Sequence, residues 1–208
     1  MAYLNPREAI GISQRTLPHW RQSDTRYFVT FRLADSIPQK SLRTWITERD
    51  AFLQQHPPPF TETDAAEYHK RFTSRIETWL DSGMGSCLLT HRDYSEIVAN
   101  ALLYFESKRY SLGEWVIMPN HVHVTVTPKP GFELSSILHS WKSFTATRIN
   151  QLTEKTGPLW QVESYNQILR NESHQWKVEE YIRNNPTKAG ITVHHASFIK
   201  KVHRHPAC

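Results

Sequence analysis

The chain has 208 residues, 38% of them hydrophobic, which is enough for one domain with a sizeable core. It contains no apolar run of membrane-spanning length and no basic-then-apolar start typical of a secretion signal, so we expect a cytoplasmic protein with no membrane partner. Cys87 and Cys208 are its two cysteines, too few for a disulfide framework or a cysteine zinc site.

The formal net charge of +5 lies at the C-terminal end, because residues 181–208 contain five Lys or Arg side chains and no acid. Such an end can contact a polyanion such as nucleic acid. A solvated basic tail over 192–208 explains the same composition, and both interpretations stay open.

The first half of the chain predicts one strand followed by helices. Residues 27–33 alternate and are rich in aromatic and β-branched side chains, which predicts the first strand. Helical spacing of apolar residues follows over 41–55, which ends at three prolines, and again over 63–80 and 94–106.

The second half predicts two paired strands, a helix, an extended segment and a final helix. Residues 110–117 and 121–127 are strands joined by a turn at Met118-Pro119-Asn120. The segment 133–152 is the clearest amphipathic helix, with Trp141 facing inward. Residues 159–170 have extended character, and 173–184 form a helix capped by Ser173 and ended by Pro186.

This order of elements predicts an α+β fold, a ferredoxin-like antiparallel sheet with helices on one face. We expect a single domain over 1–191, with a helical insertion over about 40–106 after the first strand. The remaining residues, 192–208, would form the basic, histidine-containing tail.

His121 and His123 lie one residue apart in a valine-rich strand. Strand side chains alternate faces, so both imidazoles point the same way. Neutral imidazoles are common ligands of divalent cations. Polar alternation on a half-exposed strand would produce the same spacing, so metal binding and a plain sheet surface remain open at this point.

Tyr181 and Asn185 are four residues apart, which places them on one face of the final helix. If that face covers His121 and His123, the site contains three metal ligands and a phenol. A divalent cation at such a site would offset charge on a phosphodiester, and the phenol could attack phosphorus. A packed tyrosine and an asparagine before proline are the simpler alternatives.

Six stretches of the sequence together resemble the REP-associated tyrosine transposases, which are single-tyrosine HUH nucleases. The resemblance covers roughly residues 14–191, and its motifs are Arg15–Trp20, Tyr27–Asp35, Met118–His123, Trp141–Thr145, Trp160-Gln161 and Tyr181–Gly190.

The resemblance implies a ferredoxin-like or RRM-like core and a Mg²⁺- or Mn²⁺-dependent cut of single-stranded DNA. It implies a 5′-phosphotyrosine at Tyr181, with His121, His123 and Asn185 holding the cation. The substrates it implies are REP-like palindromes that fold as hairpins, with a homodimer as a further expectation because relatives exchange the tyrosine helix. It also implies a bacterial, nucleoid-associated protein. The tail departs from the family, which usually has a tryptophan-rich segment there.

Ten side chains are candidates for DNA contacts, through positive charge, hydrogen bonding or base stacking. They are Arg15, Trp20, His139, Lys142, Arg148, Trp160, Gln161, Arg170, Arg183 and Lys188.

Two other functions and a second nucleophile compete with this interpretation. A histidine-triad hydrolase needs a third histidine where the chain has Thr125. A catalytically inactive DNA-binding module derived from such a transposase would keep the fold, although the presence of all four expected site residues argues against loss of activity. Tyr165 is the rival nucleophile, although it has no metal-ligating partner at helical spacing.

Overall fold

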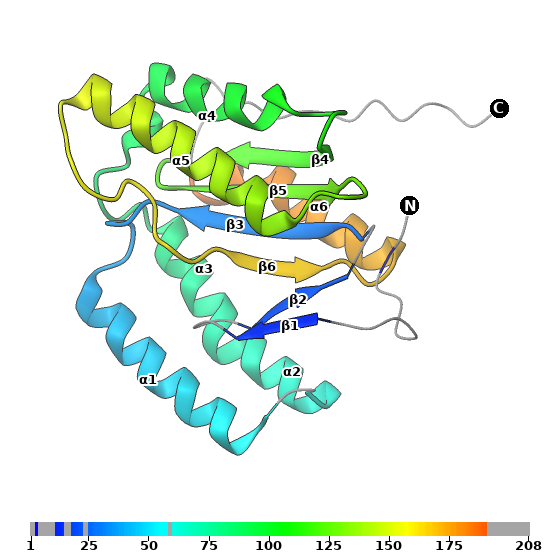
Figure 1. Ribbon diagram of the computed structural model, residues 1–208. Helices are drawn as coiled ribbons and strands as arrows, with labels where there is room; N and C mark the ends of the chain where they lie inside the picture. The colour runs from blue at the N-terminus through cyan, green and yellow to red at the C-terminus, as the bar shows by residue number, and fades with distance from the viewer. Residues whose placement is uncertain (1–2, 4–10, 15–17, 23–24, 58–59, 191–208) are drawn as a thin grey trace.

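The core of the protein is a four-stranded antiparallel sheet with strand order β4-β5-β3-β6 (Figure 1). The computed structural model describes residues 3, 11–14, 18–22, 25–57 and 60–190. The sheet consists of β3 (Tyr27–Arg32), β4 (Tyr110–Ile117), β5 (His121–Pro128) and β6 (Tyr165–Ile168). A separate hairpin of β1 (Gly11–Gln14) and β2 (Pro18–Arg21) precedes it, so the strand at 27–33 is not the first. The predicted α+β class is confirmed.

The predicted helices are all present, with small shifts at their ends. They are α1 (Gln39–Gln55), α2 (Glu62–Tyr68), a π-helical turn (His69–Thr73), α3 (Ser74–Asp81), a 3₁₀ turn (Leu88–Thr90), α4 (Arg92–Tyr104), α5 (Leu134–Thr153) and α6 (Glu172–Lys188). No helix of the described ranges is long and apolar enough to cross a membrane.

Helices cover both faces of the sheet, which corrects the expectation of a one-sided arrangement. On one face Val29, Phe31 and Val124 pack with α4 and α5 around the buried Trp141. On the other face Phe28 packs against α6. In Figure 1, α5 crosses in front of the sheet and α6 passes behind it. The valine-rich strand β5 is apolar toward α5, which leaves its histidines facing α6.

The helices α1 to α3 form their own apolar cluster, which includes Trp45, Phe52 and Phe72. By contrast, Val98 and Leu102 of α4 belong to the core of the sheet. The apolar cluster of α1 to α3 is therefore separate from that of α4, and both lie within the segment predicted as an insertion over about 40–106. Helices α1 and α3 lie beside the sheet edge formed by β6, as Figure 1 shows.

The hairpin between β4 and β5 places His121 and His123 at the start of β5. The predicted turn at 118–120 is confirmed, and the backbone N–H of Met118 donates to the carbonyl of His121 at 2.8 Å. An irregularity in register follows between Leu112 and Trp115. A Cβ at Gly113 would lie 2.3 Å from the Thr125 hydroxyl, so this close approach requires glycine.

The final helix differs from its prediction at both ends. Its N-cap is Asn171, whose side chain accepts from the His174 N–H, and not Ser173. The helix also continues through Pro186 to Lys188. Pro186 is buried, and its packing holds the last turn although proline removes one backbone hydrogen bond. Asn185 is therefore a helical residue on the same face as Tyr181.

Candidate metal and tyrosine site

His121 and His123 meet on the face of β5 that α6 covers. Antiparallel pairing sets Arg32 opposite His121 and Thr30 opposite His123. Both imidazoles are buried, with exposed fractions of 0% and 1%, and their Nε2 atoms lie 3.0 Å apart. The two Nε2 atoms thus converge on one point, as the alternation of the strand predicted.

Hydrogen bonds fix the orientation of each imidazole from behind. The Nδ1–H of His121 donates to Oδ1 of Asn120 at 2.7 Å, while the Asn120 amide donates to the carbonyl of Met84 at 2.9 Å. This bond keeps the proton on Nδ1 and leaves Nε2 of His121 as an acceptor. Nδ1 of His123 bonds the Thr30 hydroxyl at 2.7 Å. Such partners orient ligating histidines in metalloproteins.

Both histidines are uncharged. Burial lowers the pKa of His121 to about 3. Burial, with a smaller contribution from His121, lowers the pKa of His123 well below its ordinary value. Neutral imidazole is the form that ligates a cation, so the site is in the binding form over the physiological pH range.

Tyr181 reaches the histidines from α6 of the same chain. Its hydroxyl lies 3.4 Å from Nε2 of His123, and the two rings are 5.2 Å apart. Phe28 stacks on His123 and meets the Tyr181 ring edge-on at 6.1 Å. These ring contacts fix the phenol, and one chain supplies both the imidazoles and the tyrosine.

Tyr181 is a protonated phenol. Burial is the largest cause of its raised pKa, followed by the nearby carboxyl groups of Glu77 and Asp81, while contact with Asn185 acts weakly in the opposite direction. The Lys188 ammonium lies 5.3 Å from the centre of the Tyr181 ring. Ionisation of this phenol therefore requires added positive charge nearby.

Asn185 is the third predicted ligand, and the structure leaves its side chain without hydrogen bonds. It is 0% exposed, and neither Oδ1 nor Nδ2 has a hydrogen-bonding partner. An unpaired buried amide costs about 1–3 kcal/mol, so it usually signals a missing partner.

The side chains of His121, His123 and Asn185 have the chemistry of ligands for a divalent cation. The Nε2 atoms of His121 and His123 converge, and Asn185 on the facing helix has a carbonyl oxygen without a hydrogen-bonding partner. The described residues contain no group of three His, Cys, Asp or Glu side chains that could hold a metal ion. An asparagine oxygen as third ligand is compatible with that finding, because Mg²⁺ and Mn²⁺ accept carbonyl oxygens.

Tyr165 lies on β6, on the same face of the sheet as the histidine pair, because Thr30 is its partner in register as well as that of His123. Its hydroxyl bonds Oε1 of Gln167 at 3.4 Å, and its ring meets Phe28 edge-on at 6.4 Å. Burial raises the pKa of Tyr165 as well. Of the two tyrosines, Tyr181 is the one with a hydroxyl contact to His123.

The predicted DNA contacts scatter over several surfaces. His139 and Arg148 are exposed on α5, on the face of the sheet opposite the histidines. Arg170 and Lys188 are exposed around α6, and Arg183 pairs with the buried Glu114 at 3.1 Å. These five remain predictions.

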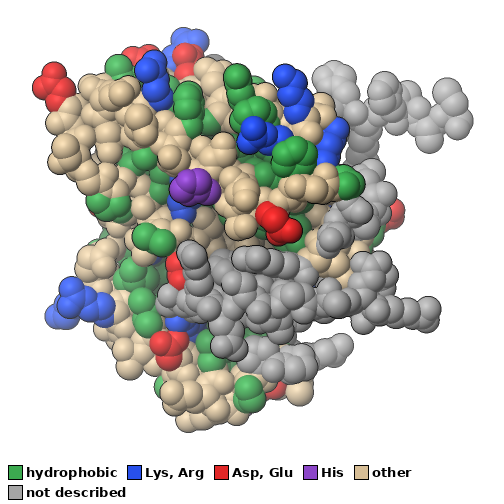
Figure 2. Space-filling model, viewed as in Figure 1, with side chains coloured by type: hydrophobic (Ala, Val, Ile, Leu, Met, Phe, Trp, Pro, Cys, Tyr) green, Lys and Arg blue, Asp and Glu red, His purple; other side chains and the backbone are tan. Residues whose placement is uncertain are grey.

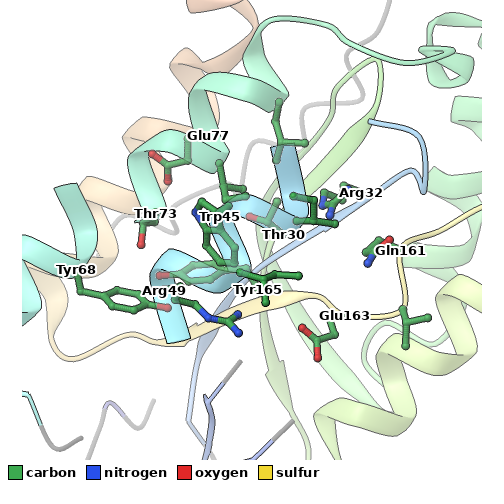
Figure 3. A pocket seen from close by; sticks show the side chains of 15 residues that line it. Thr30, Arg32, Trp45, Arg49, Tyr68, Thr73, Glu77, Gln161, Glu163 and Tyr165 are labelled. Carbon is green, nitrogen blue, oxygen red and sulfur yellow. The ribbon is translucent and has the colours of Figure 1, made fainter. Parts of the chain in front are cut away.

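Other candidates take structural roles or lie outside the described side chains. Trp160 is buried, donates to the Thr145 hydroxyl and packs on Phe31, so it is not available to stack on a base. Lys142 is half-buried and holds Val162 and Ser164 instead of facing outward. Arg15 and the side chain of Trp20 lie outside the described residues. Gln161 lines a cavity between the sheet and helices α1 and α3 (Figure 3).

A basic patch was missed by the sequence reasoning. Figure 2 shows Lys and Arg side chains gathered at the end of the sheet where β4 begins and β5 ends. Lys108, Arg109 and Lys129 belong to that end, where the Lys129 N–H donates to the Arg109 carbonyl at 2.9 Å. Their separation in sequence hid the patch. Asn120 and Thr30 were also missed as partners of the histidines, although pairing of the two strands would have indicated Thr30.

A comparison with known protein families matches part of the chain. Residues 88–185 match the family model described as "Transposase IS200 like", and this segment contains His121, His123, Tyr181 and Asn185. The match covers just under half of the chain, so this segment is similar to the IS200-like transposases. The resemblance read from the sequence is thereby confirmed.

More distant comparisons add little. One solved structure, described as a "REP associates tyrosine transposase bound to a REP hairpin", matches with a TM-score of 0.42 and 14% identity. The match covers 85% of this chain and 76% of that chain. At that TM-score the similarity supports no argument about function. None of the curated proteins matches the sequence significantly.

Proposed function

We propose that this protein is a Mg²⁺- or Mn²⁺-dependent single-stranded DNA endonuclease and strand transferase that acts on hairpin-forming repeats through a 5′-phosphotyrosine at Tyr181. The observation that supports the proposal most is the contact between the two halves of the site. The Tyr181 hydroxyl lies 3.4 Å from His123 Nε2, which itself lies 3.0 Å from His121 Nε2. The family match supplies the class of reaction.

Each side chain has a distinct role in this proposal. His121, His123 and Asn185 hold the cation, which would polarise a phosphate oxygen and favour the phenolate. Asn120 and Thr30 keep the imidazole lone pairs directed at it. Phe28 and the surrounding apolar contacts hold the Tyr181 ring and exclude water from it.

The reaction at phosphorus is a transesterification that needs no outside energy source. The Tyr181 oxygen forms a bond to phosphorus, the bond from phosphorus to the 3′-oxygen breaks, the phenol loses its proton, and the 3′-oxygen gains one. The phosphotyrosine keeps the bond energy, so a 3′-hydroxyl can reverse the step and join a strand. Lys188, beside the ring, is placed to favour the ionised phenol.

The test is formation of a covalent protein–DNA adduct. The full chain is incubated with 5′- or 3′-labelled single-stranded DNA carrying a hairpin, in Mg²⁺, in Mn²⁺ or in EDTA, and adducts are separated on denaturing gels. We expect an adduct in the presence of a cation, retaining the DNA on the 3′ side of the cut.

Two tyrosine variants form a matched pair for this test. Tyr181→Phe keeps the ring contacts with Phe28 and His123 and should abolish the adduct, whereas Tyr165→Phe should retain it. Loss of the adduct only in Tyr165→Phe would overturn the assignment. Tight DNA binding without an adduct under either cation would instead favour the inactive DNA-binding module.

A further inference from the structure

The loop at residues 83–87, between α3 and the 3₁₀ turn, lies against the turn that precedes His121. The side-chain amide of Asn120 donates to the backbone carbonyl of Met84 in this loop at 2.9 Å. The proposed cleavage reaction gives the loop no role, although the loop contacts the side chain that orients a proposed metal ligand.

The Met84 carbonyl decides which atom of the Asn120 amide faces His121. A carbonyl oxygen can only accept, so the Asn120 NH₂ group turns toward it and Oδ1 turns toward the imidazole. Oδ1 is an acceptor and lies 2.7 Å from Nδ1 of His121, so that ring nitrogen carries the proton. A neutral imidazole has one ring proton, so Nε2 keeps the lone pair that can bind a cation.

The opposite orientation of the amide would give the opposite tautomer. An N–H group of Asn120 would then face Nδ1 of His121, and the imidazole proton would move to Nε2, where it blocks metal binding. Asn120 and His121 are both 0% exposed, so bulk water is not a substitute for the Met84 carbonyl. Displacement of that carbonyl would leave a buried N–H group unpaired unless the amide rotates.

Asp35, three residues after β3, fixes the position of the loop. Its Oδ2 accepts the backbone N–H of Ser86 at 2.8 Å. Gly85 touches the same residue, because a Cβ on Gly85 would lie 2.6 Å from the Asp35 carbonyl oxygen. The φ of Gly85 is +88°, in the left-handed region that favours glycine. Gly85 directly follows Met84, so a side chain at residue 85 would displace the Met84 carbonyl.

We propose that Asp35 and Gly85 are positioning residues for His121. Through the Met84 carbonyl and Asn120 they keep the imidazole proton on Nδ1, so that Nε2 is available to the cation; the inference rests on the proposed function. Hydrogen bonds of 2.8, 2.9 and 2.7 Å connect the exposed Asp35 carboxylate, by way of the loop, to the buried imidazole. Asp35 thus acts on the cation site without contact with the cation.

The test measures the tautomer of His121 separately from the stability of the chain. Long-range ¹H–¹⁵N NMR spectra of the full chain in EDTA distinguish a ring nitrogen that carries a proton from one that does not. The signals of His121 are identified by their absence from His121→Asn. Mn²⁺ affinity is measured by calorimetry on the same proteins, and urea unfolding shows that each one is folded.

The variants are Gly85→Ala, Asp35→Ala and Asp35→Asn, with Gly131→Ala as the matched control. Gly131 also has a positive φ, +83°, but no described atom lies within 4 Å of the place that its Cβ would take. Gly131→Ala therefore introduces the same kind of backbone strain away from the site. Asp35→Asn keeps an oxygen that can accept the Ser86 N–H, whereas Asp35→Ala does not.

We expect Nδ1 of His121 to carry the proton in the parent and in Gly131→Ala, which should lose stability and keep its Mn²⁺ affinity. In Gly85→Ala the proton should move to Nε2 in part or in full, with Mn²⁺ affinity about 10- to 100-fold lower. Asp35→Ala should weaken Mn²⁺ binding about 2- to 10-fold, as expected for one hydrogen bond, and Asp35→Asn should restore it.

A double variant tests the route through Asn120. In a chain that already carries Asn120→Ala, Gly85→Ala should lower Mn²⁺ affinity no further. Additive losses would overturn the proposal, and so would a folded Gly85→Ala chain that keeps both the Nδ1 proton of His121 and the affinity of the parent. If Gly85→Ala does not fold, Asp35→Ala and Asp35→Asn decide by the same two measurements.

Failure of this inference is distinguishable from failure of the proposed function. A parent chain that binds neither Mn²⁺ nor Mg²⁺ would defeat the cation-dependent reaction. The NMR spectra in EDTA would still show whether Asp35 and Gly85 set the tautomer of His121.

Discussion

Replacing Asn185 by alanine should change stability by different amounts with and without a divalent cation. The amide is fully buried and unpaired, so the folded protein without a cation bears its desolvation cost of about 1–3 kcal/mol. Asn185→Ala removes that cost and leaves a cavity of about 30–40 Å³, worth roughly 1 kcal/mol at about 24 cal/mol per Å³. In EDTA we therefore expect the free energy of unfolding to be unchanged or raised by up to about 2 kcal/mol.

A divalent cation shifts the comparison in favour of the parent protein. At a cation concentration about 100 times its Kd, binding stabilises the parent protein by about 2.7 kcal/mol. Loss of a ligand should weaken binding at least 10- to 100-fold, the loss typical of an outer partner. Binding then stabilises the variant by only about 0.4–1.4 kcal/mol at the same cation concentration. The difference in free energy of unfolding between variant and parent therefore becomes about 1–2 kcal/mol less favourable to the variant than it is in EDTA.

The assay is urea unfolding followed by circular dichroism, in EDTA and in excess Mn²⁺, for the parent, Asn185→Ala and the control Asn184→Ala. Asn184 is exposed on the same helix, so its replacement should shift both curves equally and slightly. If Asn185→Ala destabilises the protein by the same amount in both conditions, Asn185 is a packing residue, and the ligand assignment is wrong.

Four further outcomes follow from the structure. Asn120→Ala removes the bond that orients His121, so Mn²⁺ affinity measured by calorimetry should fall about 10- to 100-fold while Asn120→Asp, which keeps the acceptor, should retain most of it. Gly113→Ala should lower the free energy of unfolding by about 1–3 kcal/mol in urea, and a simultaneous Thr125→Ala should recover part of the loss; full stability in the single variant would contradict the close approach. In EDTA, His121 should make the free energy of unfolding fall by up to about 1.4 kcal/mol per pH unit as the pH drops below ~6.5. The reason is that the pKa of His121 is about 3 in the folded protein, so the unfolded chain takes up the proton first. Urea unfolding curves measured at successive pH values should show a smaller pH dependence in His121→Asn by this amount. Lys188→Met should slow adduct formation at neutral pH and shift the rate profile to higher pH, since Lys188 is a cation beside the Tyr181 ring; an unchanged profile would exclude that role.

Periodicity was sufficient to predict most of the fold. The alternation in β5 placed the valines toward one layer and the histidines toward the other, and the spacing of apolar residues located α1, α4 and α5 to within a few residues. It could not assign α6 to the opposite face, because only tertiary packing decides which side a helix covers. Pro186 was also misleading, since local preference ends a helix there and burial overrode it.

The surroundings of the candidate site were less predictable than the fold. His121, His123, Tyr181 and Asn185 were proposed from spacing and resemblance; the structure brings the first three into contact and buries Asn185 on the same helix face as Tyr181. Their supporting contacts were not foreseen, because they join residues from distant segments. Thr30 contacts His123 across 93 positions in the chain, and the Met84 carbonyl contacts Asn120 across 36.

The electrostatics of the site explain why the proposed cleavage would not occur before a divalent cation binds. Burial removes charge from both imidazoles and keeps the Tyr181 phenol protonated, so without a cation the groups nearest phosphorus carry no charge. Glu77 and Asp81 raise the pKa of the phenol further, while the Lys188 ammonium lies 5.3 Å from the centre of the ring. A phosphodiester brings further negative charge, so binding DNA alone disfavours the phenolate. The nucleophile would become active only when DNA and a divalent cation are present together, which would restrict cutting to the assembled complex.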